Sequence, residues 1–246
     1  MATAKRAESS TQRRRRAPRG ATAGAPPPRR PDLRRRRVMD AEIACAAEEL
    51  FAQHGFHGVS IAEVAARVGI SKQNLLYYFP TKEALYRRVL DGVLDEWLER
   101  LRGLADPDKD PASALREYIA AKLRYSRDRP SGSRVFATEI IAGLPFYAAE
   151  LRERVVPALR AQVETLNRWV AAGRVEPIDA VHLMFIVWAA TQTYADFSHQ
   201  MALVLGKEAL SAADFEAAEE VVTRIVLRSI GLEAAPPGPT PAPRDR

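Results

Sequence analysis

The chain is poor in cysteine and has no long uninterrupted apolar segment. Cys45 is the only cysteine among 246 residues, so no internal disulfide can form, and the sequence is compatible with a reducing cytoplasm. We expect Cys45 to be a small buried apolar residue, which is the usual environment of a free cysteine. No run of about 18 apolar residues occurs, so we expect no membrane-spanning helix.

The sequence also lacks the motifs that carry common enzymatic chemistry. It contains no glycine-rich phosphate loop, no Gly-x-Ser-x-Gly elbow and no recognisable pair of catalytic carboxylates. His54 and His57 have a spacing found in metal sites, but no cysteine or carboxylate cluster accompanies them, and a helix end is predicted between them. We therefore expect no enzymatic activity, no metal and no cofactor.

Positive charge is concentrated in the first 37 residues. This segment holds 13 of the 37 Lys and Arg residues and two of the 31 Asp and Glu residues, so its formal charge is +11. The whole chain carries +6, which leaves −5 for residues 38–246. The isoelectric point of about 9.7 therefore reflects the N-terminal segment and does not indicate a basic folded surface.

Both ends of the chain have the composition of disordered segments. Residues 1–32 are rich in Arg, Ala, Pro, Ser and Thr without helical periodicity, and residues 233–246 contain five prolines. One interpretation of the first segment is a basic arm that follows DNA phosphates beside a folded reader. The alternatives are a solvated tail and a targeting segment. Pro26–Pro28 disfavours an amphipathic targeting helix, and no apolar segment of a secretory signal follows the arginines.

Helix-forming residues dominate the middle of the chain, and β-branched runs are few, which predicts an all-α fold. Apolar residues recur at three- and four-residue spacing, and glycine or proline follows most of these segments. Nine helices are predicted: residues 34–54, two short helices within 58–79, a long helix from residue 81, and residues 112–128, 133–142, 146–172, 177–205 and 212–230.

The stretch GVSIAEVAARVGISKQNLLYYFPTKEAL, residues 58–85, predicts two short helices around a tight turn and the start of a third helix. Ser60 can cap the first short helix, and Glu63 completes a capping box. Gly69 suits the left-handed position after that helix, and Ser71 can cap the next one. This order of elements is typical of a helix-turn-helix.

The second short helix carries the side chains that can read DNA. Its exposed positions are predicted to be Lys72, Gln73, Asn74, Tyr77 and Tyr78. Glutamine and asparagine can pair with adenine through two hydrogen bonds, and lysine can reach guanine or a phosphate. Ser60 and Ser71 are caps in the first place and phosphate contacts in the second.

These motifs resemble the TetR family of bacterial transcriptional regulators. The residues that carry the resemblance are Phe51, Gly55, the Ser60–Glu63 box and the segments 68–72, 78–80 and 82–85. The resemblance implies homodimers of nine-helix subunits, in which helices 1–3 bind a palindromic operator, helices 4–7 enclose a ligand and helices 8–9 pair. It also implies that Lys82, at the start of helix 4, contacts phosphate; the alternative is a solvated lysine.

The later helices extend the resemblance to TetR-type regulators of pyrimidine utilisation. The segments that carry it include 71–86, 116–130, 133–145 and 177–197. Such regulators repress pyrimidine catabolism and release DNA when they bind uracil or thymine, which implies the same effectors here. The resemblance points to four ligand-binding residues: Trp97, Leu98, Trp188 and Gln192.

The residues themselves give partial support to this pocket. Trp188 and Gln192 lie four positions apart and share one face of an apolar helix. A buried glutamine amide without a partner costs about 1–3 kcal/mol, and the imide edge of uracil can supply that partner. The alternative is a glutamine bonded to neighbouring backbone, with the tryptophans as core. Arg127 and Tyr194 are weaker pocket candidates, and Arg127 is also well placed to pair with Asp128 or Glu139 or to cap a helix end.

We therefore expect four parts: a basic arm over residues 1–32, a helix-turn-helix domain over 33–80, a ligand-binding and dimerisation domain over 81–232, and a tail over 233–246. The predicted function is a ligand-responsive, cytoplasmic, nucleoid-associated repressor. One rival is a TetR-type regulator with another planar effector. The other is a DNA-binding protein of low specificity that depends on its arginine arm.

Overall fold

The computed structural model of the protein describes residues 30–232, with side chains from residue 34. The chain divides into two compact units, residues 1–37 and 38–246. All regular structure within 30–232 is helical, which confirms the all-α prediction. No helix in this range is long and apolar enough to cross a membrane. The predicted arm and tail lie outside the described residues, except that helix already begins at Arg30.

The helices are α1 (Arg30–Gly58), α2 (Ile61–Val68), α3 (Lys72–Tyr78), α4 (Lys82–Arg102), α5 (Pro111–Asp128), α6 (Pro130–Ile141), α7 (Ala148–Glu150), the π-helical turn η1 (Leu151–Val155), α8 (Val156–Ala171), α9 (Ala180–Asp196), α10 (Ser198–Val204) and α11 (Ala212–Ser229). Each of the nine predicted segments is helical, and the differences lie in where helices begin and break.

Helix α1 begins four residues before the predicted start, because a proline such as Pro31 is tolerated in the first turn of a helix. Its direction changes at Gly55, where φ is 67°, a left-handed conformation that glycine adopts readily. The expectation that Cys45 is buried was wrong, since it is exposed. It lies on the face of α1 opposite Ile43 and Ala47, which are fully buried.

Two later predictions also need correction. Helix α6 begins at Pro130 and not at residue 133, because proline fits the first helical position. The predicted helix 146–172 contains the π turn η1, followed by Pro157 in the first turn of α8. Proline cannot donate to the carbonyl four residues earlier and its ring crowds that carbonyl, which accounts for a local change of hydrogen-bond pattern.

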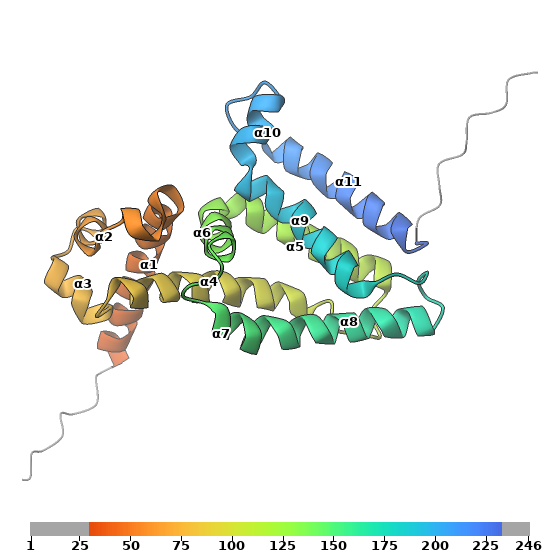
Figure 1. The fold of residues 1–246 in the computed structure, drawn as a ribbon, viewed down its shortest axis with the longest axis horizontal. Coiled ribbons are helices and arrows are strands. Elements are labelled where there is room, and N and C mark those ends of the chain that lie inside the picture. Colours follow the sequence, from red (N-terminus) through yellow and green to blue (C-terminus); the bar gives the residue numbers. More distant parts are fainter. Residues whose placement is uncertain (1–29, 233–246) are drawn as a thin grey trace, which may run out of the picture. The chain divides into compact units, whose positions relative to one another are not determined.

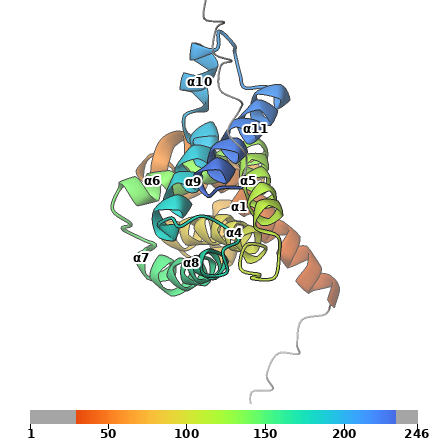
Figure 2. The same cartoon turned by 90° about the vertical axis from the view of Figure 1, so that its right-hand side faces the viewer.

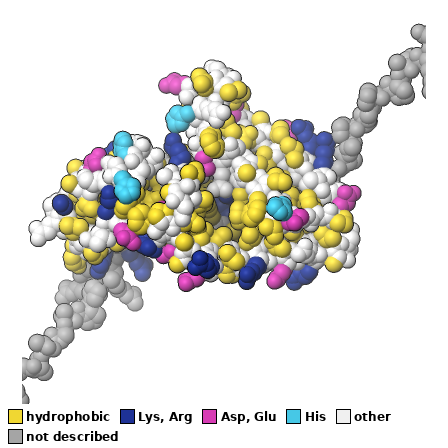
Figure 3. All heavy atoms as spheres, viewed as in Figure 1, with side chains coloured by type: hydrophobic (Ala, Val, Ile, Leu, Met, Phe, Trp, Pro, Cys, Tyr) yellow, Lys and Arg dark blue, Asp and Glu magenta, His cyan; other side chains and the backbone are white. Residues whose placement is uncertain are grey.

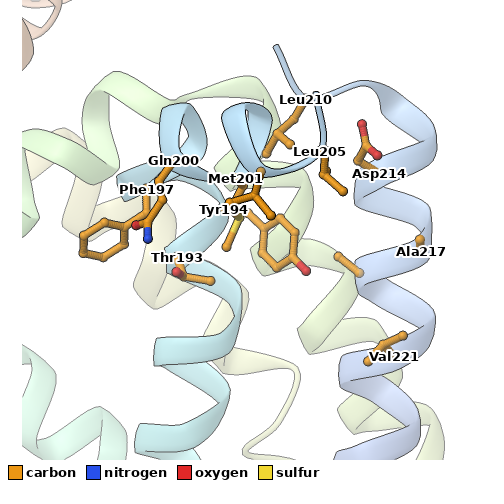
Figure 4. Close-up of a pocket in the computed structure, with 12 residues that line it drawn as sticks. Thr193, Tyr194, Phe197, Gln200, Met201, Leu205, Leu210, Asp214, Ala217 and Val221 are labelled. Carbon is orange, nitrogen blue, oxygen red and sulfur yellow. The ribbon is translucent and has the colours of Figure 1, made fainter. Parts of the chain in front are cut away.

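The predicted helix 177–205 is two helices. Helix α9 ends at Asp196, and α10 starts at Ser198 in a new direction. Phe197 between them has φ −114° and ψ 24°, outside the helical range, and its side chain is 56% exposed. The break turns α10 away from α9 and toward the start of α11, so that the three helices surround a groove (Figure 4).

The described residues of the second unit contain two apolar cores. The first joins α1, α2 and α3 to the N-terminal half of α4. The second lies among the C-terminal end of α4 and helices α5, α8, α9 and α11. Figures 1 and 2 agree that α5, α9 and α11 lie side by side and that α4 runs alongside α8. Leu98 of α4 packs against both cores, so α4 connects them.

Candidate functional site

The helix-turn-helix has the predicted local structure. The Ser60 hydroxyl accepts from Glu63 N at 3.1 Å, and the Glu63 carboxylate accepts from Ser60 N at 3.1 Å. Gly69 ends α2 with φ 77°. The Ser71 hydroxyl accepts from Asn74 N at 3.1 Å and caps α3. The two serines are therefore caps, and any phosphate contact by them is a further role.

Helix α3 presents its polar side chains to solvent. Lys72, Gln73 and Asn74 are exposed, as is Tyr77 at 67%. Tyr78 is half-buried and packs against the first core, with its ring centre 5.5 Å from that of Tyr77. On the opposite side, Leu75 and Phe79 are buried and anchor the helix. The arrangement leaves one polar face of about two turns that can enter a DNA groove.

Lys82 has a structural role that the sequence did not indicate. Its ammonium donates to Phe56 O at 2.9 Å and to Val59 O at 3.0 Å. It also lies 4.4 Å from the centre of the Phe56 ring. These contacts connect the start of α4 to the end of α1. One of the three ammonium protons remains for a phosphate, so the DNA contact of Lys82 stays a prediction.

We expect Lys82→Met to lower the free energy of unfolding by about 1.5–3 kcal/mol, because hydrogen bonds to a charged donor contribute about that much. Urea denaturation followed by circular dichroism measures the change. Lys72→Met is the matched control, since this lysine is exposed on α3 and should shift stability by less than about 0.5 kcal/mol. Equal midpoints for the two variants would show that the Lys82 contacts contribute nothing.

The four residues implied as ligand-binding lie around one small cavity. Trp97, Leu98, Trp188 and Gln192 all line a space of about 90 Å³. This volume is well below the roughly 300–1,000 Å³ of sites for drug-sized molecules, so the cavity suits a single small ring. Its walls come from both cores, with Trp97 packed on the first and Trp188 on the second.

The two tryptophans differ in their hydrogen bonding. Trp188 Nε1 donates to the Tyr118 hydroxyl at 2.8 Å, and burial raises the pKa of that hydroxyl. Trp97 Nε1 is buried without a hydrogen-bond partner among the described residues. A buried donor without a partner costs about 1–3 kcal/mol, which a ligand with a suitably placed acceptor would recover. The Gln192 amide also lines this cavity.

Lys122 belongs to the cavity and was missed in the sequence. It is 5% exposed, and its Nζ lies 4.5 Å from the centre of the Trp97 ring. Burial lowers its pKa to about 7, since a low-dielectric environment disfavours the charged form. The available signal was a lysine four positions after Tyr118, within the apolar stripe of α5.

A second unpredicted feature connects the cavity region to α1. The Arg129 guanidinium, between α5 and α6, donates to the carboxylates of Glu48 on α1 and Glu96 on α4. Glu48 is 7% exposed. The nearby Tyr125 ring lies edge-on to Trp97, with 6.0 Å between centres. Arg129 therefore joins α1 and α4 to the junction of α5 and α6, beside the cavity.

The remaining candidates lie elsewhere. Arg127 pairs with Asp128 at 2.8 Å on the surface, and Tyr194 lines the groove between α9, α10 and α11. His54 and His57 are both exposed. Among the described residues, no group of three His, Cys, Asp or Glu side chains is arranged to hold a metal ion.

Two family models match adjoining parts of the chain. Residues 43–89 match "Bacterial regulatory proteins, tetR family", and residues 90–233 match "YcdC-like protein, C-terminal region". The first match covers most of α1 and all of α2 and α3, and it ends within α4. The second covers the remainder of α4 and every later helix, including those around the cavity.

Known proteins agree with these models. The chain is 41% identical over 200 residues to the HTH-type transcriptional regulator RutR of Escherichia coli K12, which covers 80% of this chain and 94% of RutR. The ketosteroid regulator KstR2 of Mycobacterium tuberculosis shares the fold, with a TM-score of 0.64 at 19% identity over 78% of this chain and 94% of that one. AibR, solved with isovaleryl coenzyme A and operator DNA, has a TM-score of 0.62 at 16% identity over 76% and 96%. The chain is therefore a member of the TetR family of DNA-binding transcriptional regulators.

Proposed function

We propose that the protein is a repressor that leaves its operator when uracil or a related pyrimidine binds the 90 Å³ cavity, and that it controls pyrimidine catabolism. The observation that carries the proposal is the meeting of Trp97, Leu98, Trp188 and Gln192 around one cavity of single-ring size. A planar ring can pack against the tryptophans. The Gln192 amide can pair with the imide edge of the ring through two hydrogen bonds.

Helix α4 is the element that both sites share. It begins at Lys82 beside the helix-turn-helix and reaches the cavity at Trp97. The fifteen residue steps from Lys82 to Trp97 correspond to about 22 Å of helix. Because the cavity lies between the two cores, a ring that enters it can change the spacing of the helices that line it. The effector must bind the DNA-free form more tightly for this change to release DNA.

We propose a homodimer that presents two α3 helices to successive major grooves, about 34–36 Å apart. The support is apolar surface on the C-terminal helices. Ile186 on α9, Ile225 on α11 and both Leu203 and Val204 on α10 are 57–80% exposed. Figure 3 shows apolar side chains gathered on the projection that α10 forms. Such a patch is typical of a protein interface.

The groove between α9, α10 and α11 has a volume of about 620 Å³. In Figure 4, Tyr194 and Met201 lie between the helices, and Val221 lies on α11 along the groove. The groove adjoins the exposed residues of α10, so we assign it to the dimer interface and not to the effector. We propose that residues 33–80 bind DNA, with contacts from α3 and from Lys82 at the start of α4. Residues 81–232 bind the effector and form the dimer.

Titration of uracil into a gel-shift assay on the promoter of the gene itself tests this function. We expect release of the bound fragment at micromolar to millimolar uracil. Adenine, a larger ring system, should leave the complex intact at the same concentrations. Retention of the complex at millimolar uracil would exclude the pyrimidine effector and favour a regulator with another planar ligand.

A further inference from the structure

The cavity holds two groups that act as hydrogen-bond donors: an indole N–H and, in its charged form, a lysine ammonium. Trp97 Nε1 is a donor only and has no partner among the described residues. Lys122 lines the same cavity, and its ammonium has three donors and no acceptor. Both groups are held in place, since the Lys122 Nζ lies over the Trp97 ring at 4.5 Å. A ligand therefore has to bring acceptors to this side of the cavity.

Gln192 imposes no such requirement. A carboxamide presents an oxygen acceptor and an NH₂ donor, and rotation about its last bond exchanges the two. In one orientation it matches the imide edge of uracil, where a ring N–H lies between two carbonyl groups. In the other it matches the edge of cytosine, where an amino group replaces one carbonyl and the ring nitrogen accepts. The glutamine alone therefore cannot separate the two rings.

Resting on the proposed pyrimidine effector, we propose that Lys122 determines the specificity of the cavity: its ammonium donates a hydrogen bond to the ring carbonyl that cytosine replaces with an amino group, so that uracil and thymine are accepted and cytosine is rejected. An amino group opposite the ammonium would bring two donors together in a buried site and leave both unpaired. Sites built around a specific hydrogen bond reject analogues that lack it far more strongly than apolar pockets do.

The surroundings of Lys122 fit a donor that is only partly charged before the effector arrives. Burial holds its pKa near 7, Asp196 on α9 opposes that shift and Arg100 on α4 adds to it. The Asp196 carboxylate accepts from the Ser133 hydroxyl at 2.7 Å. Helix α6 and the η1 turn contribute apolar side chains to this cavity: Phe136, Ile140, Leu151 and Val155.

A carbonyl bonded to the ammonium favours the charged form. Effector binding should therefore take up a proton wherever Lys122 is partly neutral. Uracil affinity should be nearly constant below pH 6 and fall above pH 7 by a factor approaching ten per pH unit. Without Lys122 this dependence should disappear.

Isothermal titration of uracil and cytosine into the full-length dimer at pH 6, 7 and 8 tests the assignment, with wild type, Lys122→Met and Lys122→Gln. We expect wild type to prefer uracil. Lys122→Met should weaken uracil binding by about 10- to 100-fold, the loss of one charge-assisted hydrogen bond, and leave cytosine binding unchanged or improved. Lys122→Gln, which can invert, should accept both rings. Circular dichroism establishes that both variants are folded.

The outcomes separate the two proposals. If wild type binds uracil and both variants keep its selectivity and its pH profile, the Lys122 assignment is overturned while the pyrimidine effector stands. If wild type binds neither ring, the proposed effector fails, and the assignment fails with it. A pH profile that flattens in both folded variants supports the assignment, because a merely structural lysine would not produce it.

Discussion

Replacement of Arg129 by methionine is expected to lower the free energy of unfolding by about 3 kcal/mol at pH 7. The change removes the cation that pairs with Glu48, which is 7% exposed. Breaking a buried ion pair on one side costs about 3–5 kcal/mol, because the other charge stays buried and unpaired. We expect the lower end of that range, since the Arg129 side chain itself is 36% exposed. Urea denaturation measures the change.

The loss in the free energy of unfolding caused by Arg129→Met should depend on pH in a defined direction. Burial raises the pKa of Glu48, and the charge of Arg129 opposes that shift. Loss of Arg129 therefore raises this pKa further, so the folded variant binds a proton more tightly than the unfolded chain. Stability lost at pH 7 should thus be partly recovered as the pH falls toward 5 and Glu48 is protonated.

Arg127→Met is the matched control for this variant. Arg127 lies two residues away on the surface and pairs with its neighbour Asp128. Exposed pairs contribute about 0–1 kcal/mol, so the control should differ little from wild type. Equal losses for the two variants, or a deficit at position 129 that does not change with pH, would contradict the role assigned to the Glu48–Arg129 pair.

The largest effect on DNA binding is expected from Gln73→Ala in the reader helix. A good two-bond contact to a base contributes about 1–3 kcal/mol, and the proposed symmetric dimer would make it in both half-sites. The expected loss is therefore about 2–6 kcal/mol, or roughly 30-fold to 10⁴-fold in operator affinity. Lys72→Ala should instead weaken binding to all sequences and lower the salt dependence. Fluorescence anisotropy on operator and scrambled DNA at several salt concentrations distinguishes the two.

Gln53→Ala is the control for the reader helix, because Gln53 is an exposed glutamine on α1. It should bind operator and scrambled DNA as wild type does. The assignment of α3 as the reader would be untenable if Gln73→Ala and Lys72→Ala both retained wild-type affinity and selectivity. Thermal unfolding of each variant should match wild type, since Gln73, Lys72 and Gln53 are all exposed and lie outside the cores.

Local features were predictable because their signals lie a few residues apart. The Ser60–Glu63 box and the left-handed turn at Gly69 depend on hydrogen bonds within one or two helical turns, so sequence spacing alone indicates them. The same holds for the exposed face of α3, except that the prediction of an exposed Tyr78 was wrong, since it is half-buried against the first core. Breaks inside long helices were harder to predict. The turn at Phe197 and the π turn before Pro157 alter segments whose composition still favours helix.

The proposed effector site was predictable only in part. Gln192 stood out because an amide in an apolar stripe needs a partner, and resemblance to pyrimidine regulators pointed to the tryptophans. Lys122 and Tyr118 gave no comparable signal. A lysine in the middle of a helix is ordinarily solvated, and only the packing of α4, α6 and α9 against α5 buries this one.

The sequence by itself determined the helical fold and the helix-turn-helix, since capping, periodicity and turn chemistry act over a few residues, and resemblance in its motifs indicated the family. The tertiary structure decided which distant side chains meet. Glu48 and Arg129 are 81 positions apart, and Trp188 and Tyr118 are 70 apart. No local rule sets such pairs, because they depend on how whole helices pack, and that packing buries Lys122 in a cavity of single-ring size.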